Sequence, residues 1–430
     1  MEGRQVMDAH LSTTGTGFQT QVVCAQIGAR DHYAFPRALH RCGALAALVT
    51  DFWWPWNGAP DLPLLRRLRG RWHPDLQAAR VLSMNLPTLR SEAISRLTRR
   101  QHWDQMMHGN RLFQTRALRR IPWNEFLRRY PAGGRPVLFA YSYAALDLLR
   151  HAKHLGWTTL LGQIDPGPLD SRIAEHELQQ WPEFGSAWRG APACYYDHWR
   201  KELELADRII VNSEWSRQAL LTEGVAAERI DIIPVPCEES DAQDHPAKDY
   251  PTAFTSARPL RVLFLGQINL RKGVPALLTA MENLADQPVE LWMAGPLKLN
   301  LPARHAAASN IRWLGPITCG AVGKFYRNAD IFIFPTHSDG FGLTQLEAQS
   351  WRMPVIASKH CGEVVVDGHN GMLLDEVTAE CIQAALGYCC ANPQILRQWS
   401  ADSGVAPRFR LDAAGQMLMQ VIQDAQRAAL

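Results

Sequence analysis

The stretch that decides the fold runs from Asp330 to Ser358 and has the sequence DIFIFPTHSDGFGLTQLEAQSWRMPVIAS. It begins with a short apolar run, Ile331 to Phe334, which predicts a buried strand. A helix is expected to open at Gly-Phe-Gly and to end before Pro354, and a second short strand, Val355 to Ala357, follows. Such an alternation of strand and helix is typical of an α/β domain with a parallel sheet.

The glycine-rich start of this predicted helix is a candidate anion site. The backbone of Gly340, Phe341 and Gly342 would point several free N–H groups outward. The helix dipole favours negative charge at the same place. We therefore expect the loop and the helix N-terminus to hold a phosphate or another anion.

Two carboxylates flank this helix start. Glu347 lies four residues after Leu343, inside the apolar stripe of the helix, where a carboxylate needs an Arg, a hydroxyl or a ligand as its partner. Asp339 lies eight residues before Glu347, which is roughly 12 Å along a helix. That separation matches a ligand with a diphosphate in its middle, whose ribose hydroxyls would meet Glu347. A purely structural alternative remains open, in which Asp339 caps the helix and Glu347 is paired within the protein.

Two adjacent cations, Arg271 and Lys272, precede the predicted helix Val274 to Asn283. Positive charge just ahead of a helix N-terminus is unfavourable for the helix dipole unless an anion lies nearby. A diphosphate would remove the conflict, because Arg binds phosphate through its fork of N–H groups and Lys binds it as a point charge. The alternative is that both are solvated loop cations.

The residues from Asp339 to Ala348 (DGFGLTQLEA), followed by Pro354 to Ser358, resemble the Glu-x7-Glu region of family 4 glycosyltransferases, which are retaining enzymes of the GT-B fold. The resemblance covers the whole C-terminal half in the expected order. Its other parts are Arg261 to Leu278 (RVLFLGQINLRKGVPALL), Leu291 to Pro296 (LWMAGP), Asn310 to Pro316 (NIRWLGP) and Gly362 to Leu374. Two positions depart from the family: Asp339 stands where Glu is usual, and Gln267 stands where some members have Arg.

The resemblance implies two Rossmann-like, doubly wound α/β domains that face a central cleft, with the donor bound by the C-terminal domain. The donor would be a nucleoside diphosphate sugar, Asp339 would be catalytic, and neither a cofactor nor a metal would be required. The absence of any D-x-D motif agrees with a metal-free site. The implied donor-binding residues are Gly266, Arg271, Lys272, Gly340, Phe341, Gly342, Leu343 and Glu347.

The N-terminal half contributes the acceptor-side candidates. A strand from Gln21 to Ile27, a turn at Gly28, a helix and a second strand predict a β-α-β start, and ligands collect at the carboxyl ends of such strands. We therefore expect Gly28 and His32 at the cleft, with an ordinary strand-to-helix turn as the alternative. Asp165 follows another predicted strand, Thr158 to Ile164, at a place where family members often have a His.

A basic, Trp-rich segment, residues 53–130, interrupts the α/β pattern and lacks clean strands. From Arg66 to Tyr130 it carries fifteen Arg and no Lys against four acidic residues, although the whole chain has a net charge of only +3. Such a segment could meet an anionic membrane or a lipid-linked diphosphate. A solvated helical face is the more common cause, and nucleic acid is the weaker option because no binding module accompanies the charge.

The length of 430 residues and the 47% hydrophobic content predict two domains. We place the N-terminal domain at 1–236, a polar linker without periodicity at 237–258, and the C-terminal domain at 259–430, whose final helix could cross back to the first domain. No apolar run reaches about 18 residues and the N-terminus is unlike a signal peptide. The expected location is the cytoplasm, with peripheral contact at the inner membrane face as an extension. Nine scattered cysteines without C-x-x-C form neither a disulfide framework nor a zinc motif.

The predicted function is a retaining transfer of a sugar to an unidentified sugar, lipid-linked or small-molecule acceptor, in polysaccharide, glycolipid or cell-envelope glycan synthesis. Asp339 and Gln267, together with the missing His, leave an alternative: a catalytically weakened protein of the same fold that binds a nucleotide sugar. A nicotinamide-dependent oxidoreductase is a third hypothesis, opposed by the lack of a correctly placed G-x-G-x-x-G motif.

Overall fold

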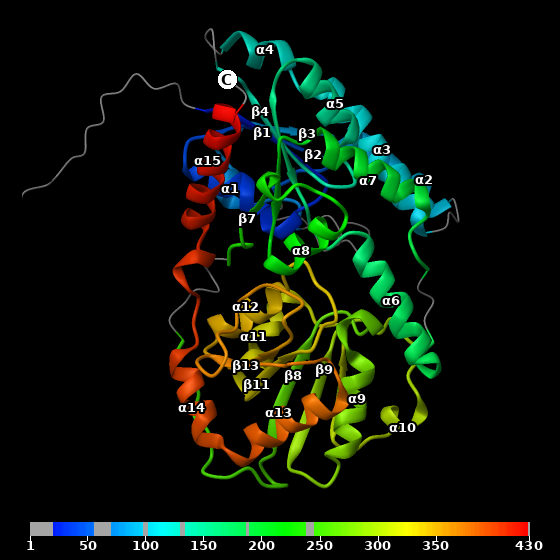
Figure 1. Ribbon diagram of the computed structural model, residues 1–430, viewed down its shortest axis with the longest axis vertical. Helices are drawn as coiled ribbons and strands as arrows, with labels where there is room; N and C mark the ends of the chain where they lie inside the picture. The colour runs from blue at the N-terminus through cyan, green and yellow to red at the C-terminus, as the bar shows by residue number, and fades with distance from the viewer. Residues whose placement is uncertain are drawn as a thin grey trace, which may run out of the picture.

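The computed structural model describes residues 20–55, 70–97, 102–129, 134–185, 189–237 and 245–428. Figure 1 shows two α/β domains stacked along the long axis of the molecule, each with helices around a twisted sheet. The predicted α/β architecture of two Rossmann-like domains is confirmed.

The N-terminal domain is built on a parallel sheet of seven strands in the order β3-β2-β1-β4-β5-β6-β7. Its central strands are apolar runs without polar alternation, as is usual for strands with both faces covered by helices. The strands are β1 (Val22–Gln26), β2 (Leu45–Thr50), β3 (Val81–Ser83), β4 (Val137–Tyr141), β5 (Thr158–Gly162), β6 (Arg208–Val211) and β7 (Ile230–Ile232). The helices are α1 (Ala34–Arg41), α2 (Asn85–Leu97), α3 (His102–Arg120), α4 (Trp123–Arg129), α5 (Leu146–His154), α6 (Pro168–Gln180), α7 (Ala193–Leu205) and α8 (Glu214–Thr222).

The C-terminal domain has a parallel sheet of six strands in the order β10-β9-β8-β11-β12-β13. Its strands are β8 (Leu260–Leu265), β9 (Val289–Ala294), β10 (Ile311–Gly315), β11 (Ile331–Phe334), β12 (Val355–Ala357) and β13 (Gly371–Leu373). Its helices are α9 (Val274–Asn283), α10 (Ala303–Ala306), α11 (Cys319–Asn328), α12 (Leu343–Ser350), α13 (Ala379–Ala391), α14 (Pro393–Asp402) and α15 (Leu411–Ala428).

Short 3-10 turns precede or follow several of these helices. They are η1 (Arg30–Tyr33), η3 (Pro74–Leu76), η4 (Pro182–Phe184), η5 (Ala227–Arg229), η6 (Leu270–Lys272) and η7 (Pro407–Phe409). The strand order reverses between β1 and β4 in the first sheet and between β8 and β11 in the second. Ligands of open α/β sheets bind beyond the carboxyl ends of the strands at such switch points.

The last helix, α15, leaves the C-terminal domain and packs on the N-terminal one (Figure 1). Leu418 and Ile422 are buried in the same core as strands β1, β4 and β5. Gly415 allows close contact with α1, because a Cβ there would lie 2.8 Å from Cys42 Sγ and 3.2 Å from the carbonyl oxygen of Ala38.

A second element crosses in the opposite direction. Helix α6 and turn η4, which we call the α6–η4 arm (residues 168–184), extend from the N-terminal sheet along the C-terminal domain (Figure 1). Phe184, at the end of this arm, is buried in the C-terminal core and stacks on His305 with ring centroids 5.4 Å apart. The carbonyl of Phe184 also accepts the Asn300 N–H at 2.7 Å.

The described part of the segment expected to be a linker packs firmly on the C-terminal domain. Tyr250 and Phe254 are buried in the core of that domain. The Tyr250 hydroxyl donates to the carbonyl of Asp330 at 2.8 Å. Residues 245–258 therefore belong to the C-terminal domain, whereas 238–244 lie outside the described residues.

The basic segment also differs from its expected form, because it contains a strand. β3 pairs in parallel with β2 and forms the edge of the sheet, and buried apolar residues such as Phe113 and Phe126 join the N-terminal core. Several of the segment's arginines are outside the described residues: Arg66, Arg67, Arg69, Arg99 and Arg100. Trp56, at the start of the segment, is outside them as well.

Candidate active site

Two loops meet beyond the carboxyl ends of β8 and β11, where the C-terminal sheet reverses its order. The first contains Gly266 and η6, and the second runs through residues 335–342. Gly273, with φ of +66°, allows the loops to touch, because a Cβ there would overlap the carbonyl oxygen of Pro335. Gly295 has the same role beside Gly266, whose carbonyl a Cβ on Gly295 would overlap.

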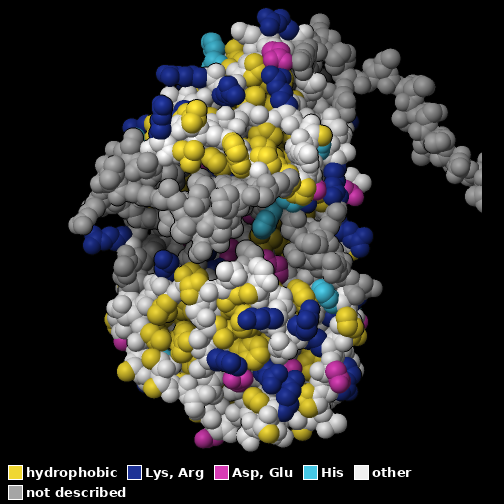
Figure 2. Space-filling view, turned by 180° about the vertical axis from the view of Figure 1, so that it is seen from behind, with side chains coloured by type: hydrophobic (Ala, Val, Ile, Leu, Met, Phe, Trp, Pro, Cys, Tyr) yellow, Lys and Arg dark blue, Asp and Glu magenta, His cyan; other side chains and the backbone are white. Residues whose placement is uncertain are grey.

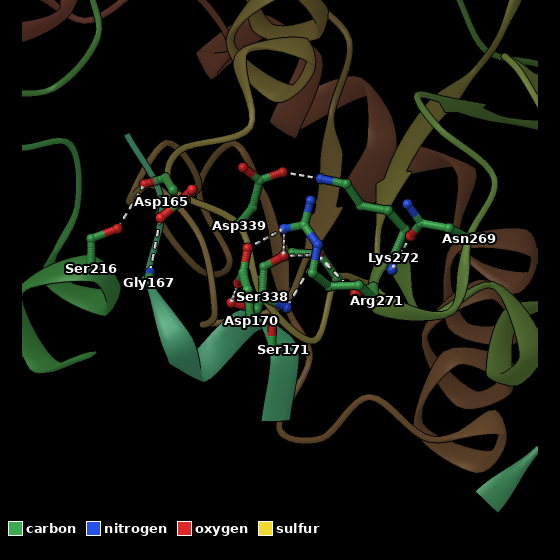
Figure 3. A network of polar contacts seen from close by, with 12 residues as sticks. Asp165, Gly167, Asp170, Ser171, Ser216, Asn269, Arg271, Lys272, Ser338 and Asp339 are labelled. Atoms are coloured by element: carbon green, nitrogen blue, oxygen red, sulfur yellow. Dashed lines mark hydrogen bonds and ion pairs between the residues drawn. The ribbon is translucent and has the colours of Figure 1, made fainter. Parts of the chain in front are cut away.

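Lys272 lies at the centre of this site and forms an ion pair with Asp339 (Figure 3). Its Nζ also lies 4.5 Å from the ring centroid of Phe334. The backbone N–H of Lys272 donates to Asn269 Oδ1 at 3.1 Å, which fixes the turn η6. Burial, with a further contribution from the charge of Arg271, lowers the pKa of Lys272 to about 7.

Arg271 points toward the other domain. Its guanidinium forms an ion pair with Asp170 of α6 at 3.2 Å and donates to the carbonyl of Ser338 at 2.5 Å (Figure 3). The Ser338 hydroxyl is also hydrogen-bonded to Asp170. Each of the two cations is therefore matched by a carboxylate, and one of these comes from the N-terminal domain.

The glycine-rich turn after β11 also touches the N-terminal domain. A Cβ on Gly340 would overlap the carbonyl oxygen of Ile164, so only glycine fits there. Two hydroxyls of the α8 N-terminus donate to the Gly340 carbonyl, Ser213 Oγ at 2.7 Å and Ser216 Oγ at 3.4 Å. Trp215 adds a hydrogen bond from Nε1 to Ser338 Oγ at 2.9 Å.

Phe341 and Gly342 complete the turn into α12. The Phe341 ring is buried in an apolar cluster and lies 5.9 Å from the ring of Phe409, so its side chain is used for packing. Gly342 has φ of +83° and is the N-cap of α12, which begins at Leu343. The structural alternative in which Asp339 caps this helix is therefore wrong. Asp339 instead accepts the Phe341 N–H at 3.3 Å.

Glu347 is half-buried on α12 and accepts a hydrogen bond from the Tyr326 hydroxyl at 2.7 Å. A hydroxyl is one of the partner types that the sequence predicts for this carboxylate.

Asp165, predicted as an acceptor-side residue, lies directly opposite the glycine-rich turn. A Cβ on Gly340 would be 3.4 Å from its Cα. Its Oδ1 accepts the Tyr143 hydroxyl at 2.6 Å, Gln163 Nε2 at 3.1 Å and the Gly167 N–H at 2.9 Å. Burial raises the pKa of the Asp165 carboxyl, Asp170 raises it further, and the Tyr143 hydrogen bond opposes both.

Gly28 and His32 lie beyond the carboxyl end of β1, as expected. Gly28 has φ of +72° and donates its N–H to Asp51 Oδ1 at 2.8 Å. Asp31, His32 and Tyr33 follow with φ of 46°, 51° and 60°. In the part of the chain that the structure describes, no hydrogen bond or ion pair joins Gly28 or His32 to the C-terminal domain.

Several residues of the site carried no signal in the sequence. Asp170, Ser338, Trp215 and Tyr143 come from separate elements, and only the folded chain brings them together. Ser213 was the exception, because a Ser before an apolar-periodic run predicts a helix cap. No group of His, Cys, Asp or Glu able to hold a metal ion occurs among the described residues.

In Figure 2, which shows the face behind Figure 1, the Lys and Arg side chains of the described residues are spread over both domains and form no single patch. In the described ranges, no helix is long and apolar enough to span a bilayer.

Comparison with known families supports the sequence resemblance. Residues 259–392 match the model of the family described as glycosyl transferases group 1. These residues contain both loops of the site, with Arg271, Lys272 and the stretch from Asp339 to Glu347. The resemblance to group 1 glycosyltransferases is thereby confirmed.

Two bacterial relatives match about half of this chain. The D-inositol 3-phosphate glycosyltransferase of Streptomyces bingchenggensis is 28% identical over 244 residues, 52% of this chain and 54% of that protein. The protein of the same name from Mycolicibacterium gilvum is 30% identical over 221 residues, 46% of this chain and 48% of that protein. The chain spans about half the length of the curated relatives that it matches.

Solved structures extend the likeness to the whole fold. Sucrose-phosphate synthase from Thermosynechococcus elongatus has a TM-score of 0.61 at 17% identity, over 95% of this chain and 100% of that one. Anabaena HepE, solved in complex with UDP, has a TM-score of 0.56 at 14% identity, over 94% of this chain and 100% of that one. Together with the two parallel sheets, these matches confirm the GT-B fold.

Proposed function

We propose that this chain, a GT-B protein whose C-terminal domain matches group 1 glycosyl transferases, transfers a sugar from a nucleoside diphosphate sugar with retained anomeric configuration. The observation that carries the proposal is the pairing at the switch point of the second sheet. There, Lys272 and Arg271 are matched by Asp339 and Asp170. A diphosphate carries the same kind of charge as these two carboxylates and can replace them.

In the proposed donor complex, Lys272, Arg271 and the N–H groups of the turn 340–342 surround the diphosphate. Charge builds up on this leaving group as the bond to the sugar breaks, so fixed cations stabilise the transition state most. Glu347 would hold the ribose hydroxyls, and Asp339, released from Lys272, would face the sugar. These roles require neither a metal nor a redox cofactor.

Relatives suggest the first substrates to try. HepE has been solved with UDP and with UDP and glucose, which makes uracil and glucose the first base and sugar to test. The name of the bacterial relatives points to a phosphorylated cyclitol as one acceptor. Acceptors in polysaccharide, glycolipid or cell-envelope glycan synthesis are the wider class, and they include lipid-linked sugars.

We further propose peripheral contact with an anionic membrane through the start of α2. Leu86 is 70% exposed, Leu89 is 38% exposed and Trp54 is 52% exposed. Asn85, the first residue of α2, ties the helix to the residue before Trp54. Its Oδ1 accepts the Trp53 N–H at 2.9 Å, and its Nδ2 donates to the Trp53 carbonyl at 2.8 Å. Arg90, also exposed, follows Leu89 on the helix, and apolar side chains beside a basic one suit the surface of an anionic bilayer. The expected location remains the cytoplasm, at its membrane face.

A second candidate function is nucleotide-sugar binding without efficient transfer. It is favoured by one specific observation: Asp339, which is one methylene shorter than the usual Glu, forms an ion pair with Lys272. If donor binding does not release that ion pair, Asp339 will not reach the sugar.

Thermal shifts with UDP, GDP and ADP and their glucose and mannose derivatives test donor binding. A ligand at a hundredfold excess over its dissociation constant stabilises the folded state by about 2.7 kcal/mol. We expect the nucleotides of one base to give the largest thermal shift. The nucleoside diphosphate of that base should be released when D-inositol 3-phosphate or a sugar acceptor is added. If a nucleotide sugar binds but no nucleoside diphosphate is released with any acceptor or with water, the second candidate is favoured. No binding at all would contradict both candidates.

A further inference from the structure

Tyr143 has an unusual backbone at a place where ligands collect. It lies two residues after the end of β4, at the switch point of the N-terminal sheet, and has φ of +71°. A side chain is disfavoured in this left-handed region. The buried carboxylate of Glu202 holds the turn, because it accepts the N–H groups of Tyr143 at 2.6 Å, Ala145 at 2.7 Å and Leu146 at 3.0 Å.

The Tyr143 side chain is fixed as firmly as its backbone. Its ring is stacked on that of Tyr195, with centroids 4.6 Å apart and planes 9° apart. Tyr195 in turn packs against Trp103 of α3, with centroids 5.0 Å apart. The hydroxyl of Tyr143 is then directed to Asp165 Oδ1 at 2.6 Å. Non-ideal backbone that the surroundings hold this rigidly is characteristic of functional sites.

Asp165 uses its two oxygens differently. Oδ1 accepts three hydrogen bonds, from the Tyr143 hydroxyl, Gln163 Nε2 and the backbone N–H of Gly167. Oδ2 receives no hydrogen bond or ion pair from any residue that the structure describes. A carboxylate with one anchored oxygen and one open oxygen is suited to accept a hydroxyl group from a ligand.

The position of Asp165 relates this open oxygen to the donor site. Its Cα is across from Gly340, and the charge of Arg271 acts on its carboxyl. An acceptor bound at Asp165 would therefore lie between the N-terminal sheet and the donor diphosphate. The half-buried rings of Tyr143 and Tyr195 beside it offer an apolar surface.

We propose that Tyr143 is a positioning residue, which holds Asp165 so that Oδ2 orients the attacking hydroxyl of an acceptor with a ring of several hydroxyl groups, a sugar or a cyclitol. This inference rests on the proposed glycosyltransfer. The C–H face of such a ring packs on the tyrosine rings, while one hydroxyl donates to Asp165.

The transfer step balances without Asp165 changing its charge. The bond between the anomeric carbon and the donor phosphate oxygen breaks, and a new bond forms to the acceptor oxygen. The acceptor's proton passes to the leaving diphosphate. Asp165 stays a carboxylate throughout and only orients the hydroxyl, as Tyr143 orients Asp165.

Tyr143→Phe tests the inference, because it removes the hydroxyl and keeps the ring on Tyr195. The assay is release of nucleoside diphosphate from the nucleotide sugar that gives the largest thermal shift, with water and then D-inositol 3-phosphate as acceptor. We expect kcat to fall about tenfold, with nucleotide affinity within about twofold of the wild type. Because the Tyr143 hydrogen bond lowers the pKa of Asp165, the acidic limb of the pH–rate profile should move to higher pH.

Tyr250→Phe is the matched control, since it also removes a buried tyrosine hydrogen bond, to the carbonyl of Asp330 at 2.8 Å. Its profile should match that of the wild type. Asp165→Asn, a second variant of nearly equal volume, should lose the acidic limb altogether. If Tyr143→Phe and the wild type have the same rate and the same acidic limb, Tyr143 does not position Asp165. That result leaves the proposed function intact, whereas a wild type that binds no nucleotide sugar contradicts the proposed function itself.

Discussion

Asp170 of the N-terminal domain forms an ion pair with Arg271 of the C-terminal domain, with 3.2 Å between Oδ2 and Nη1. The α6–η4 arm brings the carboxylate there, and Ser338 holds its other oxygen. In the proposed donor complex, a diphosphate oxygen competes with this carboxylate for the same guanidinium. Donor binding should therefore depend on Asp170, although Asp170 lies outside the domain that binds the nucleotide.

Asp170→Asn should tighten donor binding. The variant removes the charge that competes with the diphosphate but keeps a side chain that can bond Ser338. Since both partners are partly exposed, we expect about fivefold higher affinity, or roughly 1 kcal/mol. Isothermal titration with the nucleotide sugar measures it. Glu175→Gln removes an exposed charge from the same helix and should change nothing; weaker binding by Asp170→Asn would mean that Asp170 helps to hold the donor.

Lys272→Ala should reduce transfer by roughly ten- to a hundredfold, because a charged hydrogen bond to a diphosphate is worth about 1.5 to 3 kcal/mol. The rate of transfer is measured as steady-state release of nucleoside diphosphate. Lys359→Ala is the control, since Lys359 is exposed and its ion pair with Asp375, at 3.4 Å, is on the surface. Full activity of Lys272→Ala would exclude a role in phosphate binding.

The affinity for a nucleotide sugar should fall as the pH rises above about 7. Burial lowers the pKa of Lys272 to about 7 in the unliganded protein, so the amine loses its charge above that pH. A diphosphate binds the charged form, and binding must then take up a proton, which costs up to about tenfold in affinity per pH unit. Titrations from about pH 6.5 to 8.5 in buffers of different ionisation enthalpy detect both effects.

Lys272→Met provides the control for this pH dependence. The variant has no amine to titrate, so its weaker affinity should be constant over the same range. A flat profile for the wild type would show that Lys272 keeps its charge without the ligand, held by Asp339.

Glu347→Gln should weaken nucleotide binding without lowering the melting temperature. Glutamine still accepts the Tyr326 hydroxyl, which bonds Glu347 Oε2 at 2.7 Å, so the fold keeps its contact. If Glu347 instead neutralises a buried cation, its loss costs about 3 to 5 kcal/mol of stability. Melting curves and nucleotide titrations decide between the two. Glu290→Gln, whose carboxylate accepts Trp292 Nε1 at 2.8 Å, is the control in the same domain.

Leu86→Ser should weaken binding to vesicles that contain phosphatidylserine. A leucine that enters the bilayer interface contributes about 1.5 to 3 kcal/mol, so binding should fall about tenfold or more. Sedimentation with anionic vesicles measures this, and added salt should weaken the wild type as well. Tyr388→Ser, at an exposed aromatic of the C-terminal domain, is the control. Equal binding to neutral and anionic vesicles would contradict the membrane proposal.

The parts of the fold that sequence could predict are those with a local cause. Apolar runs such as Ile331 to Phe334 became strands, and Gly340, which touches the backbone of Ile164, lies where the predicted anion-binding turn begins. The prediction that two Rossmann-like domains face each other came from the resemblance of the ordered motifs to a known family. The strand and the turn depend on residues that are close together in the chain, whereas the pairing of domains rests on the resemblance.

What the sequence could not predict depends on contacts between distant segments. Asp170 precedes Arg271 by about a hundred residues, and nothing near either one indicates that they meet. Tyr143 shows no turn chemistry in the sequence, because the carboxylate that holds its backbone N–H is Glu202 of α7, 59 residues further along the chain. The sequence does not predict strand β3, because a strand of three residues is too short to show a periodic pattern.

The exchange of α15 and the α6–η4 arm between the two domains has a consequence for protein engineering. Donor specificity in a modular enzyme could be changed by grafting one half onto another scaffold at the chain crossover near residue 237. Here a cut at residue 237 would separate Phe184 from the core of the C-terminal half and Leu418 from the core of the N-terminal half. A graft that keeps both interiors intact has to carry residues 168–184 along with the donor half and leave α15 with its host.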